Sequence, residues 1–204
     1  MIPARLRLAL LALTLCAVAA VIGATLASRA GNASESRGLE LSKDGWAGAV
    51  RPPTQTVPEF SLEDQDGKTV TNEDLKGQPV VYAFVYSTCE DTCPAQVQTI
   101  KGAIDDADRK DVRVVGISVD PVNDNPKRAA SFLLEQGMTG RMEFLLGTRE
   151  ELQPVWDAFA IQPQQDNLEH SAHTILADAT GRQRIGFPYD FMTQEALAHD
   201  LGRL

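Results

Sequence analysis

The sequence lacks any cluster of basic residues, and its 28 acidic residues outnumber its 19 basic ones, for a formal net charge of −9. This balance argues against nucleic acid as a partner. Internal repeats and low-complexity blocks are absent, and the length beyond the N-terminal segment suits one domain with a substantial core. Cysteine is scarce. Of the three present, only two lie beyond the N-terminal apolar segment, so that domain can form at most one internal disulfide.

The N-terminal segment contains a run without any charge, residues 8–27, preceded by Arg5 and Arg7. A run of this length is about right for a membrane-spanning helix, and the two arginines place its N-terminal side in the cytoplasm. Cleavage near Ala27 or Ala30 by a signal peptidase is the alternative. We therefore predict a signal anchor, or transmembrane segment, over residues 1–30.

The rest of the chain divides into two parts. Residues 31–55 are polar and show no sustained period, which predicts a tether. Residues 56–204 form the predicted domain. The orientation of the anchor, with no transit region rich in Arg and Ser, favours a bacterial cytoplasmic membrane, with the domain facing the periplasm or cell exterior.

Strands and helices alternate along the domain. Near-continuous apolar runs predict buried strands, and helical spacing with capping residues predicts the helices between them. A hairpin precedes this pattern, and a second hairpin and a last helix beginning at Thr193 follow it. The predicted strands are 80–86, 112–119 and 144–146, the helices are 94–108, 125–134 and 148–159, and the second hairpin pairs 173–178 with 183–187. This order predicts a thioredoxin-like α/β sandwich.

Cys89 and Cys93 follow the first central strand, at the carboxyl end where open α/β sheets place their sites. A spacing of four puts both sulfurs on one face of a helical turn. The positive end of the helix favours thiolates, which bind soft metals such as monovalent copper or attack disulfides. A structural disulfide or two thiols without a function are the alternatives for so short a motif.

The candidate third ligand is a histidine, and the chain has only three: His170, His173 and His199. His199 lies on the last predicted helix and is expected at the surface. His170 and His173 stand before the strand that begins the second hairpin, in the loop expected opposite the cysteines. No proline occurs between Pro163 and Pro188, which argues against a general dithiol exchanger of the thioredoxin type.

Several stretches in this order make the chain resemble the SCO/SenC family of copper-binding, thioredoxin-like proteins. They span essentially the whole domain, and their combination is far more specific than any one of them. They are residues 74–81 (DLKGQPVV), 88–94 (TCEDTCP), 118–126 (SVDPVNDNP), and the stretch from His170 to Gly181.

The resemblance implies that Cys89, Cys93 and His170 bind copper, monovalent or divalent, with His173 as a non-ligand. It implies a membrane-tethered metallochaperone, rather than an enzyme, that delivers copper to cytochrome c oxidase subunit II or another copper acceptor. Within the stretch 118–126, we expect Asp124 to cap the following helix. A role near the metal for Asp120 stays open.

An enzymatic hypothesis competes with the chaperone. Cys89 and Cys93 would be the catalytic residues of a thiol-disulfide oxidoreductase that keeps recipient cysteines reduced, with Cys89 attacking and Cys93 resolving the mixed disulfide. A peroxiredoxin is a weaker third option, because the Pro-x-x-x-Thr-x-x-Cys arrangement is missing around Cys89. His170 separates the first two hypotheses, since metal binding needs it and dithiol exchange does not.

Overall fold

The computed structural model describes residues 39–164 and 172–204. The predicted anchor over residues 1–30 and the predicted ligand His170 lie outside these ranges. None of the helices within the described ranges combines the length and the apolar character needed to span a bilayer.

A six-stranded mixed sheet forms the centre of the domain, in the order β1-β8-β7-β4-β5-β6. Strand β4 is parallel to β5, and β5 is parallel to β6, whereas β7 is antiparallel to both β4 and β8, and β1 is antiparallel to β8. The strands are β1 (Ala49–Val50), β4 (Val80–Val85), β5 (Arg113–Ser118), β6 (Glu143–Leu145), β7 (His173–Ala177) and β8 (Gln183–Pro188).

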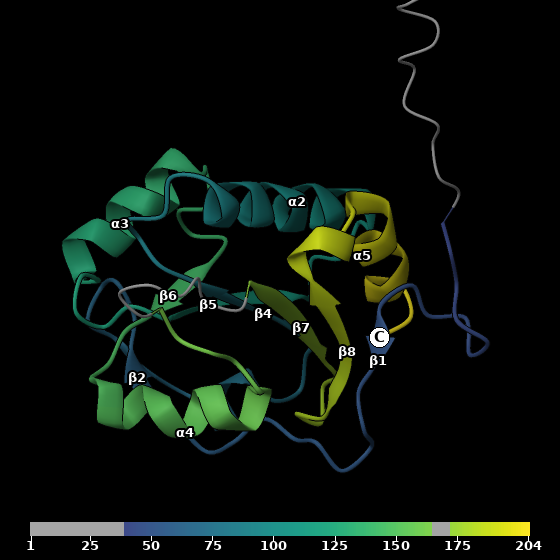
Figure 1. The fold of residues 1–204 in the computed structure, drawn as a ribbon, viewed down its shortest axis with the longest axis horizontal. Coiled ribbons are helices and arrows are strands. Elements are labelled where there is room, and N and C mark those ends of the chain that lie inside the picture. The colour runs from purple at the N-terminus through teal and green to yellow at the C-terminus, as the bar shows by residue number, and fades with distance from the viewer. Residues whose placement is uncertain (1–38, 165–171) are drawn as a thin grey trace, which may run out of the picture. The chain divides into compact units, whose positions relative to one another are not determined.

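Helices cover both faces of the sheet (Figure 1). One face carries α2 (Thr92–Asp106), α3 (Pro126–Glu135) and α5 (Gln194–Leu201); the other carries α4 (Arg149–Phe159) and the hairpin of β2 (Ser61–Glu63) and β3 (Thr69–Thr71). Short 3-10 turns lie at Glu73–Leu75 and Tyr189–Phe191.

The central strand β4 is buried along its whole length because it serves two cores. Its odd-numbered side chains, such as Val81 and Val85, pack under α2 and α5. Its even-numbered side chains, such as Tyr82 and Phe84, pack against α4. This alternation follows from the period of two along a strand. The layers and strand order confirm the predicted thioredoxin-like sandwich.

The helix ends show which capping predictions were right. Thr148 and Glu151 form a capping box at the start of α4, and the Thr193 hydroxyl accepts a hydrogen bond from the Ala196 amide at the start of α5. At α3 the prediction was wrong. The side chain of Asn125, rather than that of Asp124, accepts the hydrogen bond from the Arg128 amide, at 3.0 Å.

The predicted tether over residues 31–55 is wrong in its second half. Residues 39–55 belong to the folded domain. Trp46 lies in the core under α5, and β1 pairs with the edge strand β8. The buried carboxylate of Asp200 holds this segment by accepting hydrogen bonds from the amides of Ala47 and Gly48, both at 2.9 Å. His199, expected at the surface, is partly buried, and its Nε2 lies 3.0 Å from the carbonyl oxygen of Gly45.

Candidate metal centre

The two cysteines lie side by side at the carboxyl end of β4. Cys89 belongs to the loop between β4 and α2, and Cys93 is the second residue of α2. Cys89 is 9% exposed and Cys93 is fully buried. No disulfide joins them. Cys89 is therefore the sulfur that an approaching partner meets first, with Cys93 behind it.

Hydrogen bonds make Cys89 a thiolate. The Cys93 side chain donates to its sulfur, and so do the amides of Cys93, at 3.2 Å, and of Asp91, together with the Tyr86 hydroxyl. These donors outweigh burial and lower the pKa of Cys89 to about 5. The same hydrogen bond, together with burial, raises the pKa of Cys93. At neutral pH the pair thus holds one thiolate and one thiol.

Tyr86, the residue after β4, belongs to the same group of side chains. Burial and its hydrogen bond to Cys89 raise the pKa of the Tyr86 hydroxyl. It therefore stays protonated and remains a donor to the Cys89 thiolate.

A partly buried carboxylate, that of Asp124, supports the cysteine loop. Asp124 accepts hydrogen bonds from the amide of Ser87 at 2.7 Å, from the Ser87 hydroxyl at 2.5 Å and from the Ser118 hydroxyl at 2.5 Å. Burial raises the pKa of Asp124 despite these bonds. Asp120 accepts instead from the side chain of Asn123, at 2.8 Å. The loops after β4 and β5 are joined by these bonds.

The start of β7 is tied to the cysteine helix. The side-chain amide of Gln96, one turn after Cys93, donates to the carbonyl oxygen of His173 at 2.9 Å and to the Thr174 hydroxyl at 3.0 Å. His173 itself pairs with Pro188 in the sheet. The backbone just before it is also fixed, because the Tyr189 amide donates to the carbonyl oxygen of Ala172 at 2.9 Å.

The structure brings together two of the three predicted ligands, Cys89 and Cys93. His170 lies outside the described residues, so its place beside the sulfurs stays a prediction. Within residues 39–164 and 172–204, no group of three or more His, Cys, Asp or Glu side chains is arranged to hold a metal ion.

Sequence reasoning missed two side chains near the cysteines. Tyr86 donates a hydrogen bond to Cys89, and Gln96 joins the cysteine helix to the start of β7. Gln96 carried a signal: it shares the buried face of α2 with Cys93, Val97 and Ile100, where a polar residue needs a partner. Tyr86 carried none, since its position at a strand end is compatible with simple packing.

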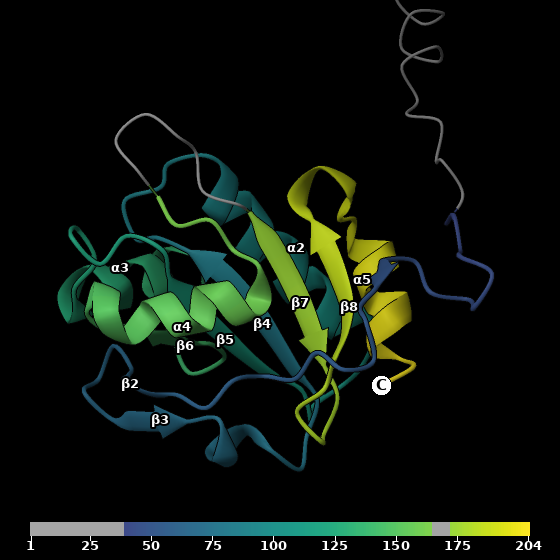
Figure 2. The same cartoon turned by 60° about the horizontal axis from the view of Figure 1, so that its bottom comes forward.

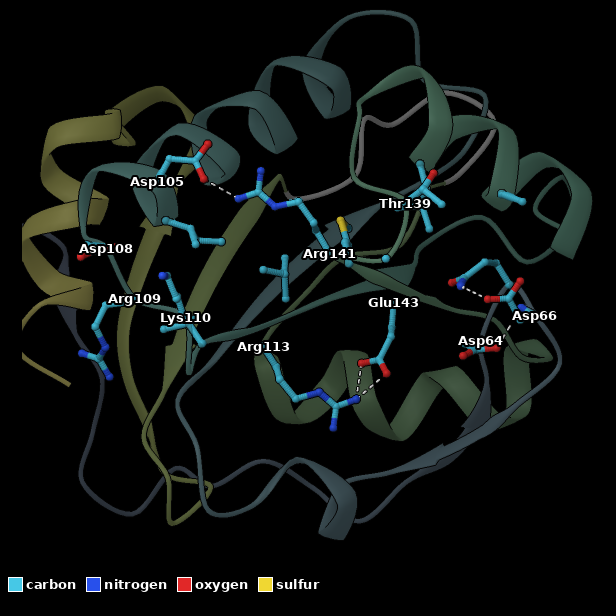
Figure 3. A pocket seen from close by; sticks show the side chains of 18 residues that line it. Asp64, Asp66, Asp105, Asp108, Arg109, Lys110, Arg113, Thr139, Arg141 and Glu143 are labelled. Atoms are coloured by element: carbon cyan, nitrogen blue, oxygen red, sulfur yellow. Dashed lines mark hydrogen bonds and ion pairs between the residues drawn. The ribbon is translucent and has the colours of Figure 1, made fainter.

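A cavity of about 710 Å³ lies at the opposite end of the sheet, near the beginnings of β5 and β6 (Figure 3). Its lining includes no cysteine and no histidine. Most of its charges are neutralised by neighbours: Arg113 pairs with Glu143, and Arg141 pairs with Asp105 at 2.6 Å. The cavity therefore offers no donor set for a soft metal.

Fold and site together define a thioredoxin-like α/β protein with two free cysteines at the carboxyl end of its central strand. A family model described as SCO1/SenC matches residues 48–204. The chain belongs to the SCO1/SenC family, as its motifs predicted.

Named members of this family are similar to the chain in sequence and in structure. The SCO1 protein homolog of Bacillus subtilis is 29% identical over 141 residues, which cover 64% of this chain and 72% of that protein. The structure of Bradyrhizobium japonicum ScoI with copper bound is 31% identical with a TM-score of 0.62, and the match covers 72% of this chain and 98% of that chain.

A structure of BsSco is 25% identical with a TM-score of 0.66, and the match covers 76% of this chain and 96% of that chain. BsSco is described there as a member of the Sco family of cytochrome c oxidase assembly proteins, with a disulfide switch.

Proposed function

We propose that this protein is a copper metallochaperone that binds one copper ion through Cys89, Cys93 and His170. The observation that carries the proposal is the pair of free cysteines on one helical turn, with the Cys93 amide donating to the Cys89 sulfur; such hydrogen bonds lower the pKa of Cys89. Thiolates select monovalent copper, and an added imidazole suits either oxidation state of copper. Binding requires Cys93 to lose its proton, so loading with copper releases protons.

The backbone on both sides of His170 supports its assignment. The amide of Gln164 donates to the carbonyl oxygen of Val119, after β5, at 3.0 Å, and His173 is held by Gln96 on the cysteine helix. Three residues of chain span at most about 11 Å, and this limits how far His170 can lie from His173. Carriage of copper by the solved relative ScoI adds to this support.

The order of delivery follows from the difference in burial, because Cys89 is 9% exposed and Cys93 is fully buried. We infer transfer by ligand exchange, in which the thiolates of a copper acceptor replace Cys89 first and the buried Cys93 last. The description of BsSco as a cytochrome c oxidase assembly protein supports the copper centre of oxidase subunit II as the acceptor. Residues 1–30 would anchor the chain in the bacterial cytoplasmic membrane, with the domain of residues 56–204 facing the periplasm or cell exterior.

The unequal pKa values of the two cysteines favour thiol-disulfide exchange as a second function. The Cys89 thiolate would attack one sulfur of a partner disulfide, which breaks that bond and releases one partner thiolate. Cys93 would then lose its proton and attack Cys89 Sγ, which frees the second partner sulfur. The partner ends reduced by two electrons and the Cys89–Cys93 pair ends oxidised as a disulfide.

Copper titration of the full-length chain under reducing conditions tests the chaperone proposal. The parent should bind one Cu(I) per chain, and Cys89→Ser and Cys93→Ser should each lose tight binding. His170→Ala should weaken Cu(II) binding and change its absorption spectrum, while its rate of disulfide reduction stays that of the parent. His199→Ala is the matched control, because His199 contacts Gly45 rather than the cysteine loop.

Two results would overturn the metallochaperone assignment. One is a parent that binds no copper stoichiometrically. The other is a His170→Ala variant that binds both oxidation states as the parent does, while either serine variant loses only its disulfide reductase activity. The second result would leave the oxidoreductase as the function.

A further inference from the structure

Tyr86 is the residue that follows β4. Its side chain is partly buried and packs against the cores on both faces of the sheet. The Cys89 amide donates to the carbonyl oxygen of Tyr86 at 3.3 Å, so residues 86–89 form a turn that folds Cys89 back toward the tyrosine. Asp124 holds this turn through the amide of Ser87. Tyr86 and Cys89 therefore stand at the two ends of a turn that is fixed from outside.

Tyr86 makes a hydrogen bond with each of the two cysteines. Its hydroxyl donates to the Cys89 sulfur, and its backbone hydrogen-bonds the Cys93 side chain. The Cys93 side chain and amide also donate to the Cys89 sulfur, the amide at 3.2 Å. Metal binding takes the proton of the Cys93 thiol, whereas the Tyr86 hydroxyl keeps its own. In the loaded site, Tyr86 is thus a side-chain donor that remains available to Cys89.

Packing alone does not account for the hydroxyl, because a phenylalanine has the same ring and would fill the same space after β4. A hydrogen bond to a thiolate stabilises the negative charge on its sulfur. Cu(I) leaves more of that charge on the sulfur than Cu(II) does, so the bond favours Cu(I). Hydrogen bonds around a cysteine sulfur tune the balance of oxidation states in copper sites in this way.

We propose that Tyr86 is a positioning residue of the copper site and biases it toward Cu(I), through the hydrogen bond of its hydroxyl to the Cys89 sulfur. This role rests on the proposed copper function, and it holds whichever residue supplies the third ligand. Tyr86 acts through Cys89 and makes no bond to the metal. Loss of the hydroxyl leaves both sulfurs in place and changes only how strongly Cys89 donates charge to copper.

Tyr86→Phe tests this role because it removes only the hydroxyl, and the chain offers a matched control. Tyr82 is a tyrosine within β4 that packs into the core on the side of α4, its ring 5.0 Å from that of Phe159. Tyr82→Phe therefore deletes a hydroxyl from the same strand, away from the cysteine loop. The full-length parent and both variants are compared by thermal unfolding, by Cu(I) and Cu(II) competition titrations, and by the absorption spectrum of the Cu(II) form.

We expect Tyr86→Phe to remain folded and to bind Cu(I) about tenfold more weakly, as loss of an outer partner of a metal ligand does. Its Cu(II) affinity should stay the same or rise, and the sulfur-to-Cu(II) absorption band should move to longer wavelength, because the hydroxyl no longer stabilises the charge on the Cys89 sulfur. Tyr82→Phe should match the parent in all copper measurements. A loss of stability alone would weaken the binding of both ions, so the changed ratio of affinities separates the two effects.

A folded Tyr86→Phe variant that keeps the affinity ratio and the absorption band of the parent would overturn the role, as would equal changes in Tyr82→Phe. A tyrosinate-to-copper band in the parent would also overturn it, because Tyr86 would then be a ligand. Should Tyr86→Phe fail to fold, Tyr86→Leu decides by the same readouts, since it also lacks the hydroxyl.

The outcomes for this role and for the metallochaperone can be told apart. A parent that binds no copper overturns both. A parent and a His170→Ala variant that behave as proposed, beside a Tyr86→Phe variant with an unchanged ratio of Cu(I) to Cu(II) affinity, overturn the role of Tyr86 alone.

Discussion

The side chains gathered at the two ends of the central sheet are of different kinds. The central strands β4, β5, β7 and β8 of this sheet can be followed in Figure 2. At the carboxyl end of β4, the Cys89 sulfur accepts hydrogen bonds from backbone and side-chain donors, and the partly buried Asp124 joins the neighbouring loops. At the amino ends of β5 and β6, a cavity is lined by charged side chains, among which Arg113 pairs with Glu143 and Arg141 pairs with Asp105.

The difference between the two ends shows that the volume of a cavity is a poor guide to the candidate metal centre. The charged cavity has volume, but most of its ionic groups are already neutralised by their neighbours. At the cysteine end both sulfurs are buried, yet they are soft donors whose protonation is set by the fold. Donor chemistry, rather than volume, therefore locates the candidate metal centre.

The largest contrast should appear when one carboxylate is removed from each end. Asp124→Ala leaves the Ser87 amide and the Ser118 hydroxyl without their acceptor, and we expect it to lower the free energy of unfolding by about 2 kcal/mol. Asp105→Ala, which removes an exposed partner of Arg141, should cost at most about 0.5 kcal/mol. Urea unfolding of the copper-free chain measures both, and equal losses would contradict the comparison.

Thiol reactivity sharpens the account of the cysteine end. Because Cys89 is a thiolate and Cys93 is a buried thiol, iodoacetamide at pH 7 should modify Cys89 at least about tenfold faster. The Cys89 rate should fall as the pH is lowered through about 5, where its sulfur takes up a proton. Mass spectrometry of quenched samples follows each site, and faster labelling of Cys93 would refute the assignment of the thiolate.

A carboxylate at the amino end should show its effect through pH and stability alone. Burial favours the neutral acid at Asp178, but hydrogen bonds from Thr180, from the Arg182 amide and from Arg184 outweigh it and lower its pKa. Its contribution is therefore present above the pKa of the unfolded chain and is lost as the pH falls through the lowered value.

Asp178→Asn should accordingly cost about 1 kcal/mol at pH 7, and the difference from the parent should shrink as the pH falls below about 4. Copper binding should be unchanged. Chemical unfolding at a series of pH values gives the curve, and a difference that grows in acid would contradict the hydrogen-bond account.

The smallest effect is expected for the exposed pair of the cavity rim. A double-mutant cycle with Asp105→Ala and Arg141→Ala should give a coupling energy of about 0.3 kcal/mol that disappears in high salt. Both single variants should load copper as the parent does. A coupling energy above about 2 kcal/mol would contradict the account, because exposed ion pairs contribute less than that.

Much of the fold could be predicted from local signals. The buried strand over 80–86 and the helix that follows it were visible because apolar periodicity and the residues at their ends agree. The segment containing Trp46 was misjudged as part of a tether. Its fixed position depends on the Asp200 carboxylate about 150 residues away, and no local pattern reports such a contact.

The residues of the candidate site also fall into those that a local pattern predicts and those that depend on distant contacts. Cys89 and Cys93 were predictable because their spacing and position carry the chemistry. The role of Asp124 was not, since a carboxylate before a helix usually caps it, whereas here it accepts hydrogen bonds from Ser87, 37 residues earlier in the chain. Gln96 lay between these cases, marked as unusual by its buried helix face but without a visible partner.

X-ray absorption of the Cu(I)-loaded full-length chain tests the central claim most directly. The account predicts a copper ion with two sulfur neighbours and one nitrogen neighbour, and loss of the nitrogen in His170→Ala with both sulfurs retained. A copper environment without sulfur, or a nitrogen neighbour that persists unchanged in His170→Ala, would contradict it.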